Sequence, residues 1–429
     1  MWPKFSTEKQ EKPALQLSLV PLYASENGSE TPYRRKSRSK TTICLKLVAV
    51  LMACFIFSSS LYYIMVHMAH CARWSNVFQD PEYTSFYEKY VAPVSGEGEK
   101  DNEFFKTMFT EIYDGEYDVP ENVETYRQRY DTFLTKYEKT YTGAEKEYRF
   151  RVYVHNVIEY EMEESRTPWM DYDDTPFTDM TDSELRKMLV SGGDFPSMEG
   201  ISRSEESLFK NGESRPLEVD WRSLGKVTAI KNQKNCGSCW AFACVAAVES
   251  QLAIRKNTTV ILSEQQLVDC DSRNNGCHGG YRPYAMSYIV KNGLYPESLY
   301  PYLATEKNQC RVLNQTKVFI NDYRILSQNE ETQADWIAQN GPVTFGMKVI
   351  KQMYNYRSGV FEPSRADCEE KSLGSHAMAI VGYGSENGRD YWIVKNSWGS
   401  WWGQSGYFKL ARGVNACGAA ENVVAPLIN

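Results

Sequence analysis

Eight of the eleven cysteines lie in the last half of this 429-residue chain. Such a density of thiols is unusual in a cytosolic enzyme, and it indicates disulfides formed in an oxidising compartment. The other three, Cys44, Cys54 and Cys71, lie in or beside an apolar segment near the N-terminus. With 42% hydrophobic and 13% aromatic residues, the composition is that of a globular chain with two or three domain-sized parts.

The apolar segment covers residues 47–66 and contains no charged residue. As a helix it would be about 30 Å long, enough to cross a bilayer. Six basic residues between positions 34 and 46 precede it, so the positive-inside tendency puts residues 1–46 in the cytoplasm and the later chain in a lumen or outside. We therefore expect an uncleaved signal-anchor. A cleaved signal peptide is the alternative, although its charged leader would be unusually long; a buried core helix fits the polar, basic flanks poorly.

Charge is unevenly distributed along the chain. Residues 72–215 carry a net charge of −15, whereas residues 216–429 carry +3. No basic surface on the scale that nucleic acid requires is present in this pattern. If the acidic part covers the C-terminal part, protonation of its carboxylates at low pH should weaken the association.

The chain is predicted to divide into six parts. Residues 191–215 are rich in Gly, Ser and Glu with little apolar period, which is typical of a linker that proteases cut. The parts are a polar tail (1–46), the membrane span (47–66), an acidic spacer (67–123), a mostly helical region (124–190), the linker (191–215) and a C-terminal domain (216–429).

Two helices are predicted between about Tyr126 and Ser165 from apolar residues that recur at helical spacing. On the second helix, six residues spaced four, four, three, four and four apart lie on one face. They are Glu145, Arg149, Tyr153, Asn156, Tyr160 and Glu164. A plain structural interpretation is a salt-bridged helix that packs on a hairpin partner.

The C-terminal domain combines a helical half with a strand-rich half. An apolar run over residues 239–254 predicts a helix, and Ser263 with Gln266 three residues later indicates the start of another. From His376 onward, short β-rich runs alternate with glycine-containing turns. This order predicts an α+β fold with a cleft between the halves.

Only two of the five histidines, His278 and His376, lie in the C-terminal domain, so a nucleophilic cysteine there would need one of them as its base. His376 and Asn396 are symmetric about Glu386 in a predicted Asn-Gly hairpin. The simplest antiparallel register therefore pairs them, to within a residue, and the Asn396 amide oxygen could fix the imidazole tautomer. The alternative is two unrelated polar residues at strand ends.

The cysteine pair in NCGSCW, residues 235–240, raises two possibilities. Cys239 begins the apolar helix, whose N-terminus favours a thiolate and a lowered pKa, whereas Cys236 lies in the preceding loop. Gln233 could donate its side-chain NH2 to an oxyanion together with the backbone N–H of Cys239. A lone glutamine could equally be solvated, and a thiol–disulfide oxidoreductase built on Cys236 and Cys239 stays open.

Five stretches in this order resemble a papain-like cysteine protease of the cathepsin L type. They are NQKNCGSCWAF (232–242), LSEQQLVDC (262–270), GCHGG (276–280), SHAMAIVGYG (375–384) and YWIVKNSWGSWWG (391–403). His376 and Asn396 follow Cys239 by 137 and 157 residues, close to the range of roughly 130–150 in that family. The six-residue helical face, with Phe177 and Asp179, is similar to the inhibitory propeptides of this family.

The resemblance implies a two-lobed fold, with a helical lobe and a β-barrel-like lobe, after an inhibitory propeptide (124–190). Cys239 would be the nucleophile, His376 its acid–base partner, Asn396 the residue that orients the imidazole, and Gln233 the oxyanion donor. Trp398 would shield the Asn–His hydrogen bond. The implied disulfides are Cys236–Cys277, Cys270–Cys310 and Cys368–Cys417, which leaves Cys244 free and buried.

The resemblance also implies a substrate cleft in which Gly279 and Gly280 bind the substrate backbone. Other implied substrate-binding residues are Tyr281, Arg282, Gly346, Ala377, Asn422, Trp398 and Trp402. No histidine-bearing insertion follows Gly280, which favours an endopeptidase over a carboxydipeptidase. Lys234 stands where the family commonly has glycine.

The expected function is therefore that of a membrane-anchored zymogen of a cysteine endopeptidase that acts on proteins or peptides. Cystatin-like proteins would be inhibitors, and neither a cofactor nor a metal is expected. Acid should promote a cut within about residues 191–216 that releases an endolysosomal or secreted enzyme. A non-catalytic binding protein on the same scaffold is the alternative, although such proteins usually lack one of the four active-site residues, and all four are present.

Overall fold

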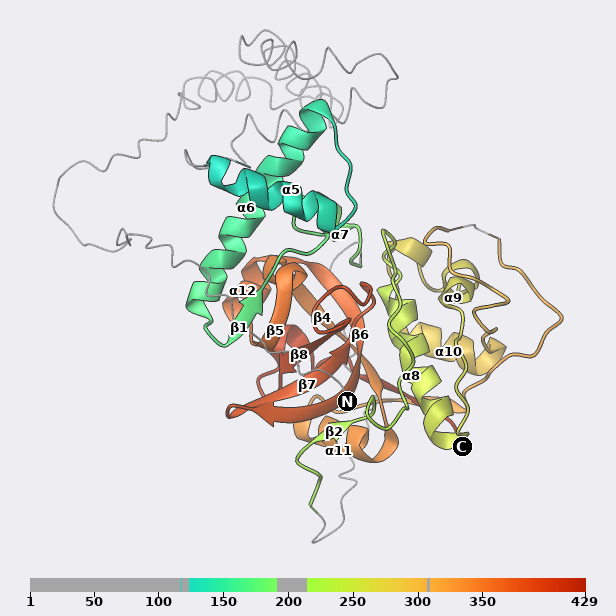
Figure 1. Cartoon of the computed structure of the whole chain (residues 1–429). Helices are drawn as coiled ribbons and strands as arrows, with labels where there is room; N and C mark the ends of the chain where they lie inside the picture. Colours follow the sequence, from blue (N-terminus) through green and yellow to red (C-terminus); the bar gives the residue numbers. More distant parts are fainter. Residues whose placement is uncertain (1–116, 118–122, 191–213, 307–308) are drawn as a thin grey trace, which may run out of the picture. The chain divides into compact units, whose positions relative to one another are not determined.

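The computed structural model describes residue 117 and residues 123–190, 214–306 and 309–429 (Figure 1). The expected tail (1–46), the membrane span (47–66), nearly all of the acidic spacer (67–123) and most of the linker (191–215) lie outside the described residues. Within the described ranges, no helix is both long and apolar enough to cross a bilayer.

The region before the linker is mostly helical, as its apolar spacing predicts. It contains a 3-10 turn and helices of very different length. They are η2 (Val123–Tyr126), α5 (Arg127–Lys136), α6 (Gly143–Arg166), strand β1 (Met170–Tyr172) and α7 (Asp182–Arg186). A complete capping box starts α7, because Thr181 accepts from the Glu184 N–H and the Glu184 carboxylate accepts from the Thr181 N–H.

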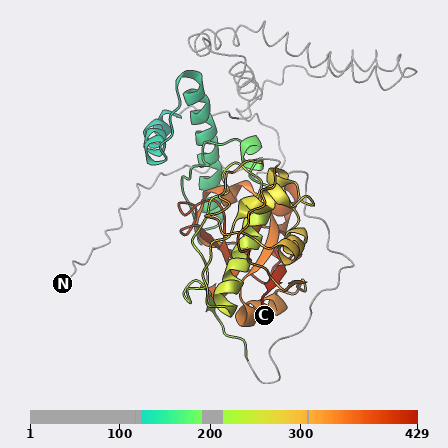
Figure 2. The same ribbon diagram turned by 90° about the vertical axis from the view of Figure 1, so that its right-hand side faces the viewer.

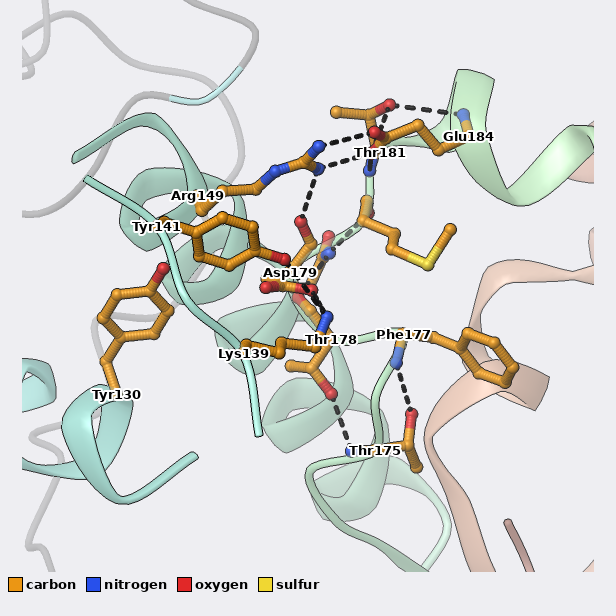
Figure 3. A network of polar contacts seen from close by, with 12 residues as sticks. Tyr130, Lys139, Tyr141, Arg149, Thr175, Phe177, Thr178, Asp179, Thr181 and Glu184 are labelled. Carbon is orange, nitrogen blue, oxygen red and sulfur yellow. Dashed lines mark hydrogen bonds and ion pairs between the residues drawn. The ribbon is translucent and has the colours of Figure 1, made fainter. Parts of the chain in front are cut away.

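The polar face of α6 packs on the chain that follows it (Figure 3). Arg149 forms two hydrogen bonds of 2.6 Å to the Glu184 carboxylate, and Asn156 donates to the carbonyl oxygens of Thr178 and Met180. Burial raises the pKa of Asp179, and the ion pair with Lys139 opposes this shift. The polar face of this helix is therefore a scaffold for residues 174–184.

The domain after the linker begins its helical half with the apolar helix predicted at Cys239. Ser263 caps the second helix by accepting from the Gln266 N–H, as expected. The Gln266 side chain does not complete the box, since it donates to Tyr288 and Gly293 instead. The helices are α8 (Cys239–Arg255), α9 (Glu264–Cys270), η3 (Gly276–His278), α10 (Arg282–Asn292), α11 (Glu330–Asn340), η4 (Lys351–Asn355), α12 (Arg365–Glu370) and η5 (Ala416–Gly418).

The strands form one largely antiparallel sheet. They are β2 (Val219–Asp220), β3 (Asp322–Ile325), β4 (Val343–Ile350), β5 (Tyr356–Phe361), β6 (Ser372–Glu386), β7 (Arg389–Lys395), β8 (Tyr407–Ala411) and β9 (Val424–Leu427). Their order, which includes β1 from before the linker, is β1-β5-β8-β7-β6-β4-β9-β3, and β2 pairs with β6. Within the described chain this path is open at β1 and β3, so strand pairing does not close the expected barrel.

Two apolar cores correspond to the two halves of the C-terminal domain. One is built on α8, α9 and α10 and contains Trp240 and Met286. The other is built on the sheet, and it continues without a break into α5 and α6 through Tyr130 and Tyr153. Helix α8 runs beside the sheet and contacts β6 along the boundary between the halves (Figures 1 and 2). Helix α6 contacts η4. The region before the linker thus shares a core with the strand-rich half.

Candidate active site

Cys239 lies at the boundary of the two halves, as the first residue of α8. Its side chain is fully buried, and its Sγ accepts a hydrogen bond from the Ala377 backbone N–H at 3.4 Å. The preceding loop is held by the Cys236–Cys277 disulfide and by a 2.8 Å hydrogen bond from the Gly237 N–H to the Cys277 carbonyl. Cys236 is therefore a structural partner, and a redox pair of Cys236 with Cys239 does not form in this structure.

His376 lies on β6, directly before the residue that donates to Cys239. Its Nε2 is 2.8 Å from Asn396 Oδ1, and the Ser397 N–H donates to the same oxygen at 2.7 Å. Because an amide oxygen can only accept, Nε2 carries the proton and Nδ1 keeps a lone pair. Within the described residues Nδ1 has no hydrogen-bond partner. The imidazole is thus in the tautomer that can accept a proton at Nδ1.

The contact between His376 and Asn396 is present, but the register expected for it is wrong. The ladder pairs Glu386 with Arg389 around a two-residue Asn-Gly turn, and a bulge between Ile380 and Gly382 shifts the pairing again. Asn396 follows the last residue of β7, and the pairing partner of His376 is Met347 on β4. The two side chains therefore form their hydrogen bond although the two residues are not paired across neighbouring strands.

Two tryptophans expected at the substrate cleft are buried in this structure. Trp398 stacks on the His376 ring with centroids 4.8 Å apart, where it covers the imidazole. Trp402 is fully buried, packs on Trp398 at 5.0 Å and donates to the carbonyl oxygens of Met353 and Tyr354. Trp402 is therefore part of the core in this form of the chain, and its contact with substrate stays a prediction.

Gln233 points into the same site and is oriented by a residue that the sequence analysis missed. Ser397 donates its hydroxyl to Gln233 Oε1 at 2.7 Å, so the amide NH2 faces the opposite way. That NH2 donates to the carbonyl oxygens of Cys236 and Met188, both at 2.8 Å. No local pattern indicates the Ser397 contact, because the two residues are 164 positions apart.

Residues 185–190 occupy the cleft beside Cys239. The Val190 N–H donates to the Ser375 carbonyl at 2.9 Å, and the Tyr354 hydroxyl donates to the Leu185 carbonyl at 3.1 Å. A Cβ on Gly279, whose φ is +112°, would lie 2.6 Å from the Val190 side chain. Residues 185–190 therefore cover the thiol, and their Met188 carbonyl accepts the hydrogen bond of the Gln233 side-chain NH2.

Burial beneath residues 185–190 changes the pKa expected for the Cys239 thiol and for the His376 imidazole. Burial raises the pKa of the Cys239 thiol to about 11, although the Ala377 N–H and the charge of Arg282 lower it. Burial also lowers the pKa of His376 to about 4, against the hydrogen bond to Asn396, which raises it. The lowered thiol pKa predicted from the helix N-terminus is thus wrong for this form of the chain, because burial outweighs the helix. Near pH 7 the pair is a neutral thiol and a neutral imidazole.

The remaining residues expected in the cleft have mixed environments. A Cβ on Gly280 would lie 2.5 Å from the Trp240 ring, so this glycine is required by packing in the helical half. Arg282 is fully buried and donates to the Asn422 carbonyl at 2.8 Å, so it does not line an open pocket here. Tyr281 is nearly buried and packs on Tyr284.

Two of the expected cleft residues, Gly346 and Asn422, line one cavity of about 350 Å³ near the Cys368–Cys417 disulfide. Ala377 is buried and pairs with Gly346 across β4 and β6. The structure also contains a Cys270–Cys310 disulfide, and Cys244 is a free buried thiol. Among the described residues, no group of His, Cys, Asp and Glu side chains could hold a metal ion.

Comparison with known proteins identifies both parts of this arrangement. Residues 215–427 match the papain family of cysteine proteases, and residues 130–185 match the cathepsin propeptide inhibitor domain. The chain belongs to the papain family of cysteine proteases and carries the propeptide of a zymogen.

The relatives and solved structures agree with this assignment. The chain is 39% identical to the probable cysteine protease RD21C of Arabidopsis thaliana over 68% of this chain and 66% of the relative. It is 35% identical to the viral cathepsin of Lymantria dispar multicapsid nuclear polyhedrosis virus over 72% and 86% of the two chains. The structure of digestive procathepsin L2 from Tenebrio molitor larval midgut is similar, with 34% identity, a TM-score of 0.63 and coverage of 70% and 99%.

The chain spans only part of the length of two curated relatives. The chain covers slightly less than two thirds of the Arabidopsis protease and of the cysteine proteinase of Trypanosoma brucei brucei, at 66% and 65% of their lengths.

The fold of the described residues is the papain-like α+β fold with its propeptide, as predicted.

Proposed function

We propose that this chain is the precursor of a cysteine endopeptidase that hydrolyses proteins or peptides with Cys239 as its nucleophile. The carrying observation is the convergence of Cys239, the His376–Asn396 pair and the Gln233 amide at a cleft where a propeptide carbonyl already accepts from Gln233.

In the proposed reaction, His376 Nδ1 takes the proton of the Cys239 thiol, and the thiolate attacks the substrate carbonyl carbon. The oxyanion accepts from Gln233 Nε2 and from the Cys239 N–H, while Nδ1 returns its proton to the leaving amine. Water then hydrolyses the thioester, and His376 again transfers the proton. Asn396 keeps Nε2 protonated throughout, so that only Nδ1 exchanges a proton with the reacting groups.

The propeptide holds this machinery inactive in the proposed zymogen. The Met188 carbonyl oxygen accepts from Gln233 where a substrate oxygen would, and the neutral thiol is a poor nucleophile. The propeptide docks through the shared apolar core, strand β1 and the ion pairs of Lys351 with Glu159 and Asp182. Acid-promoted cleavage within residues 191–216 would release the enzyme.

Endopeptidase specificity is supported by the chain after Gly280. Residues 282–292 form α10, packed against α8, rather than a loop over the cleft. Proteins that enter an open cleft, including cystatin-like inhibitors, would then have access to both sides of Cys239 once the propeptide leaves. Tyr281, Arg282 and Asn422 would influence the choice of substrate side chain.

We further propose that the zymogen is a type II membrane protein with its catalytic domain in a lumen or outside the cell. Support comes from the uncharged residues 47–66 behind a basic cluster, and from the three disulfides, which need an oxidising compartment. A pulse–chase at pH 5 should yield a soluble product from a membrane-bound precursor. A product that stays in the membrane pellet would contradict release.

Active-site labelling tests the central proposal. Acid-activated protein is treated with a peptidyl epoxide, and the adduct is mapped by mass spectrometry. Modification at Cys239, together with hydrolysis of a fluorogenic dipeptide substrate, is expected, and Cys239→Ser should lose both. Cys244→Ser is the matched control and should keep both. Absence of any adduct in properly folded protein would favour a binding protein instead.

A further inference from the structure

The propeptide covers a second surface of the catalytic domain that lies beside the cleft rather than inside it. Strand β1 adds to the free edge of β5, with Met170 opposite Gly359 and Tyr172 opposite Tyr356. The other edge of β5 is already paired with β8. Loss of the propeptide therefore leaves one edge of the sheet open, with unpaired backbone donors and acceptors that an extended peptide can use.

An aromatic pocket continues this open edge toward the active site. The Phe177 ring lies against Tyr354, Trp398 and Trp401 with centroid distances of 5.4, 5.5 and 5.0 Å. Between the pocket and β5, Asp173 and Asn355 exchange two hydrogen bonds. We name the β5 edge, η4 and the Trp398–Trp401 pocket the β5 strip. Propeptide residues 169–177 lie along the edge and in the pocket, and Glu159 and Asp182 pair with Lys351 at the start of η4.

The charged side chains beside the β5 strip are of both signs. Arg389, on β7, packs over the Trp169 ring at 3.9 Å and also pairs with Glu362 at 2.6 Å, and the Ser358 hydroxyl donates to Asp171. The other two aspartates of the covering segment, Asp173 and Asp174, pair with Lys136 and Arg129 of the propeptide itself. The strip thus fits an extended peptide that carries aromatic residues.

The position of the strip identifies which part of a substrate would reach it. His376 must lie beside the amine that leaves, so the substrate chain on the C-terminal side of the cut bond passes the His376 ring. Trp398 stacks on that ring and is also one wall of the Phe177 pocket. The strip is therefore continuous with the leaving-group side of the cleft.

We propose that, in the activated enzyme, the β5 strip is a docking site for protein substrates. It would bind an extended segment on the C-terminal side of the cut bond, with an aromatic side chain in the Phe177 pocket and the following residues added as a strand to β5. The inference rests on the proposed protease function, and it assigns the enzyme a preference for long unfolded substrates over short peptides.

A competition experiment separates the strip from the cleft. Enzyme activated from the full chain is assayed on a fluorogenic dipeptide substrate and on unfolded casein, each with and without a synthetic peptide of residues 168–178. We expect the peptide to slow casein cleavage severalfold and to leave dipeptide hydrolysis unchanged, whereas a scrambled peptide of the same composition changes neither. Equal inhibition of both substrates, or inhibition of neither, would overturn the proposal.

A variant tests the residues directly. Arg389→Ala removes the cation over Trp169 and should weaken binding of the 168–178 peptide about 2- to 10-fold, the range of a single cation–π contact. Arg324→Ala on β3 removes the same charge from a half-exposed side chain paired with Asp322, and should leave peptide binding unchanged. If both variants bind the 168–178 peptide as tightly as the parent enzyme does, the proposal that the β5 strip is a docking site would be contradicted. Failure of dipeptide hydrolysis by the parent enzyme would instead contradict the proposed function.

Discussion

Single side chains at the active site are oriented by partners far along the chain. Asn396 and Ser397 are neighbours, yet one orients His376 and the other orients Gln233. The tautomer of the imidazole and the direction of the Gln233 amide therefore depend on one short segment after β7. Lys234, one residue after Gln233, has a φ of +52°, a left-handed backbone conformation that is sterically strained for lysine.

Asn396→Ala should reduce kcat/KM about 10- to 100-fold, because a hydrogen bond to a group that becomes charged contributes about 1.5–3 kcal/mol. The imidazole would lose its fixed tautomer, so the acidic limb of the pH–rate profile should shift as well. Asn340→Ala, at the C-terminal end of α11, is the control and should change neither quantity. An unshifted pH profile with full activity would contradict the orienting role.

Lys234→Gly should stabilise the folded protein by about 0.5 kcal/mol without changing kcat. Removal of the left-handed strain gains about 1 kcal/mol, and the greater freedom of an unfolded glycine offsets about half of that gain. Chemical denaturation measures the difference. Lys234→Ala keeps the strain and is the control; equal stabilisation by alanine would indicate that the side-chain charge, not φ, is responsible.

At the scale of elements, the propeptide acts through α6 and the chain it supports. The apolar spacing was sufficient to predict α5 and α6, because helix amphipathicity is a local property. It could not predict that Asn156 and Arg149 would hold residues 178–184, since those contacts depend on how the chain turns back after β1. The register of the hairpin between β6 and β7 failed for a local reason, because its two-residue turn is centred on Asn387-Gly388 and not on Glu386. The bulge after Ile380 changes the pairing by only one residue.

Glu159 on α6 provides a pH-dependent contact with the enzyme. Burial alone would raise the pKa of Glu159, but hydrogen bonds and charges from His155 and Lys351 lower it to about 2. His155 lies on α6 itself, so only the part of the lowering that comes from Lys351 depends on docking. That part stabilises the docked state above the pKa of the undocked carboxyl, and it is lost as the pH falls toward 2. The Lys351 contact therefore persists at pH 5.

Glu159→Gln should weaken propeptide docking at pH 7 and remove part of its decline between pH 4.5 and 2. Docking is measured in the Cys239→Ser zymogen, which cannot cut itself, from the rate at which a second protease degrades the propeptide. Glu161→Gln, two residues further along α6, is the comparison, because Glu161 pairs with Arg129 of the propeptide itself. A pH profile identical to that of the parent zymogen would contradict the contribution of Glu159.

At the scale of the whole molecule, zymogen and enzyme differ in the environment of one thiol. The propeptide shares the core of the strand-rich half, so its removal exposes the cleft and the β5 strip together. The thiol pKa of about 11 in the zymogen follows from this burial. Exposure of the cleft should return water to the pair and favour the thiolate–imidazolium form.

Alkylation by iodoacetamide measures this change. In the zymogen, Cys239 is fully buried and its thiol pKa is raised to about 11, so labelling at pH 7 should be slow and should increase with pH, because only the thiolate reacts. The activated enzyme should react far faster at pH 7, with a rate almost independent of pH between 6 and 8. Cys244 is fully buried in the core of the helical half and should stay unlabelled in both forms. A pH-independent rate in the zymogen would contradict the neutral pair.

The sequence by itself determined the family, the α+β division, the nucleophile candidate, the disulfide pairs implied by that family and the presence of a propeptide. These depend on local spacing and on residue types that few functions use together. Only the tertiary structure decided that Trp402 and Gly280 serve packing, that Ser397 aligns Gln233, and that Met188 occupies the oxyanion donor. Burial, which depends on contacts between residues far apart in the chain, also decided that NCGSCW holds a neutral thiol in the zymogen.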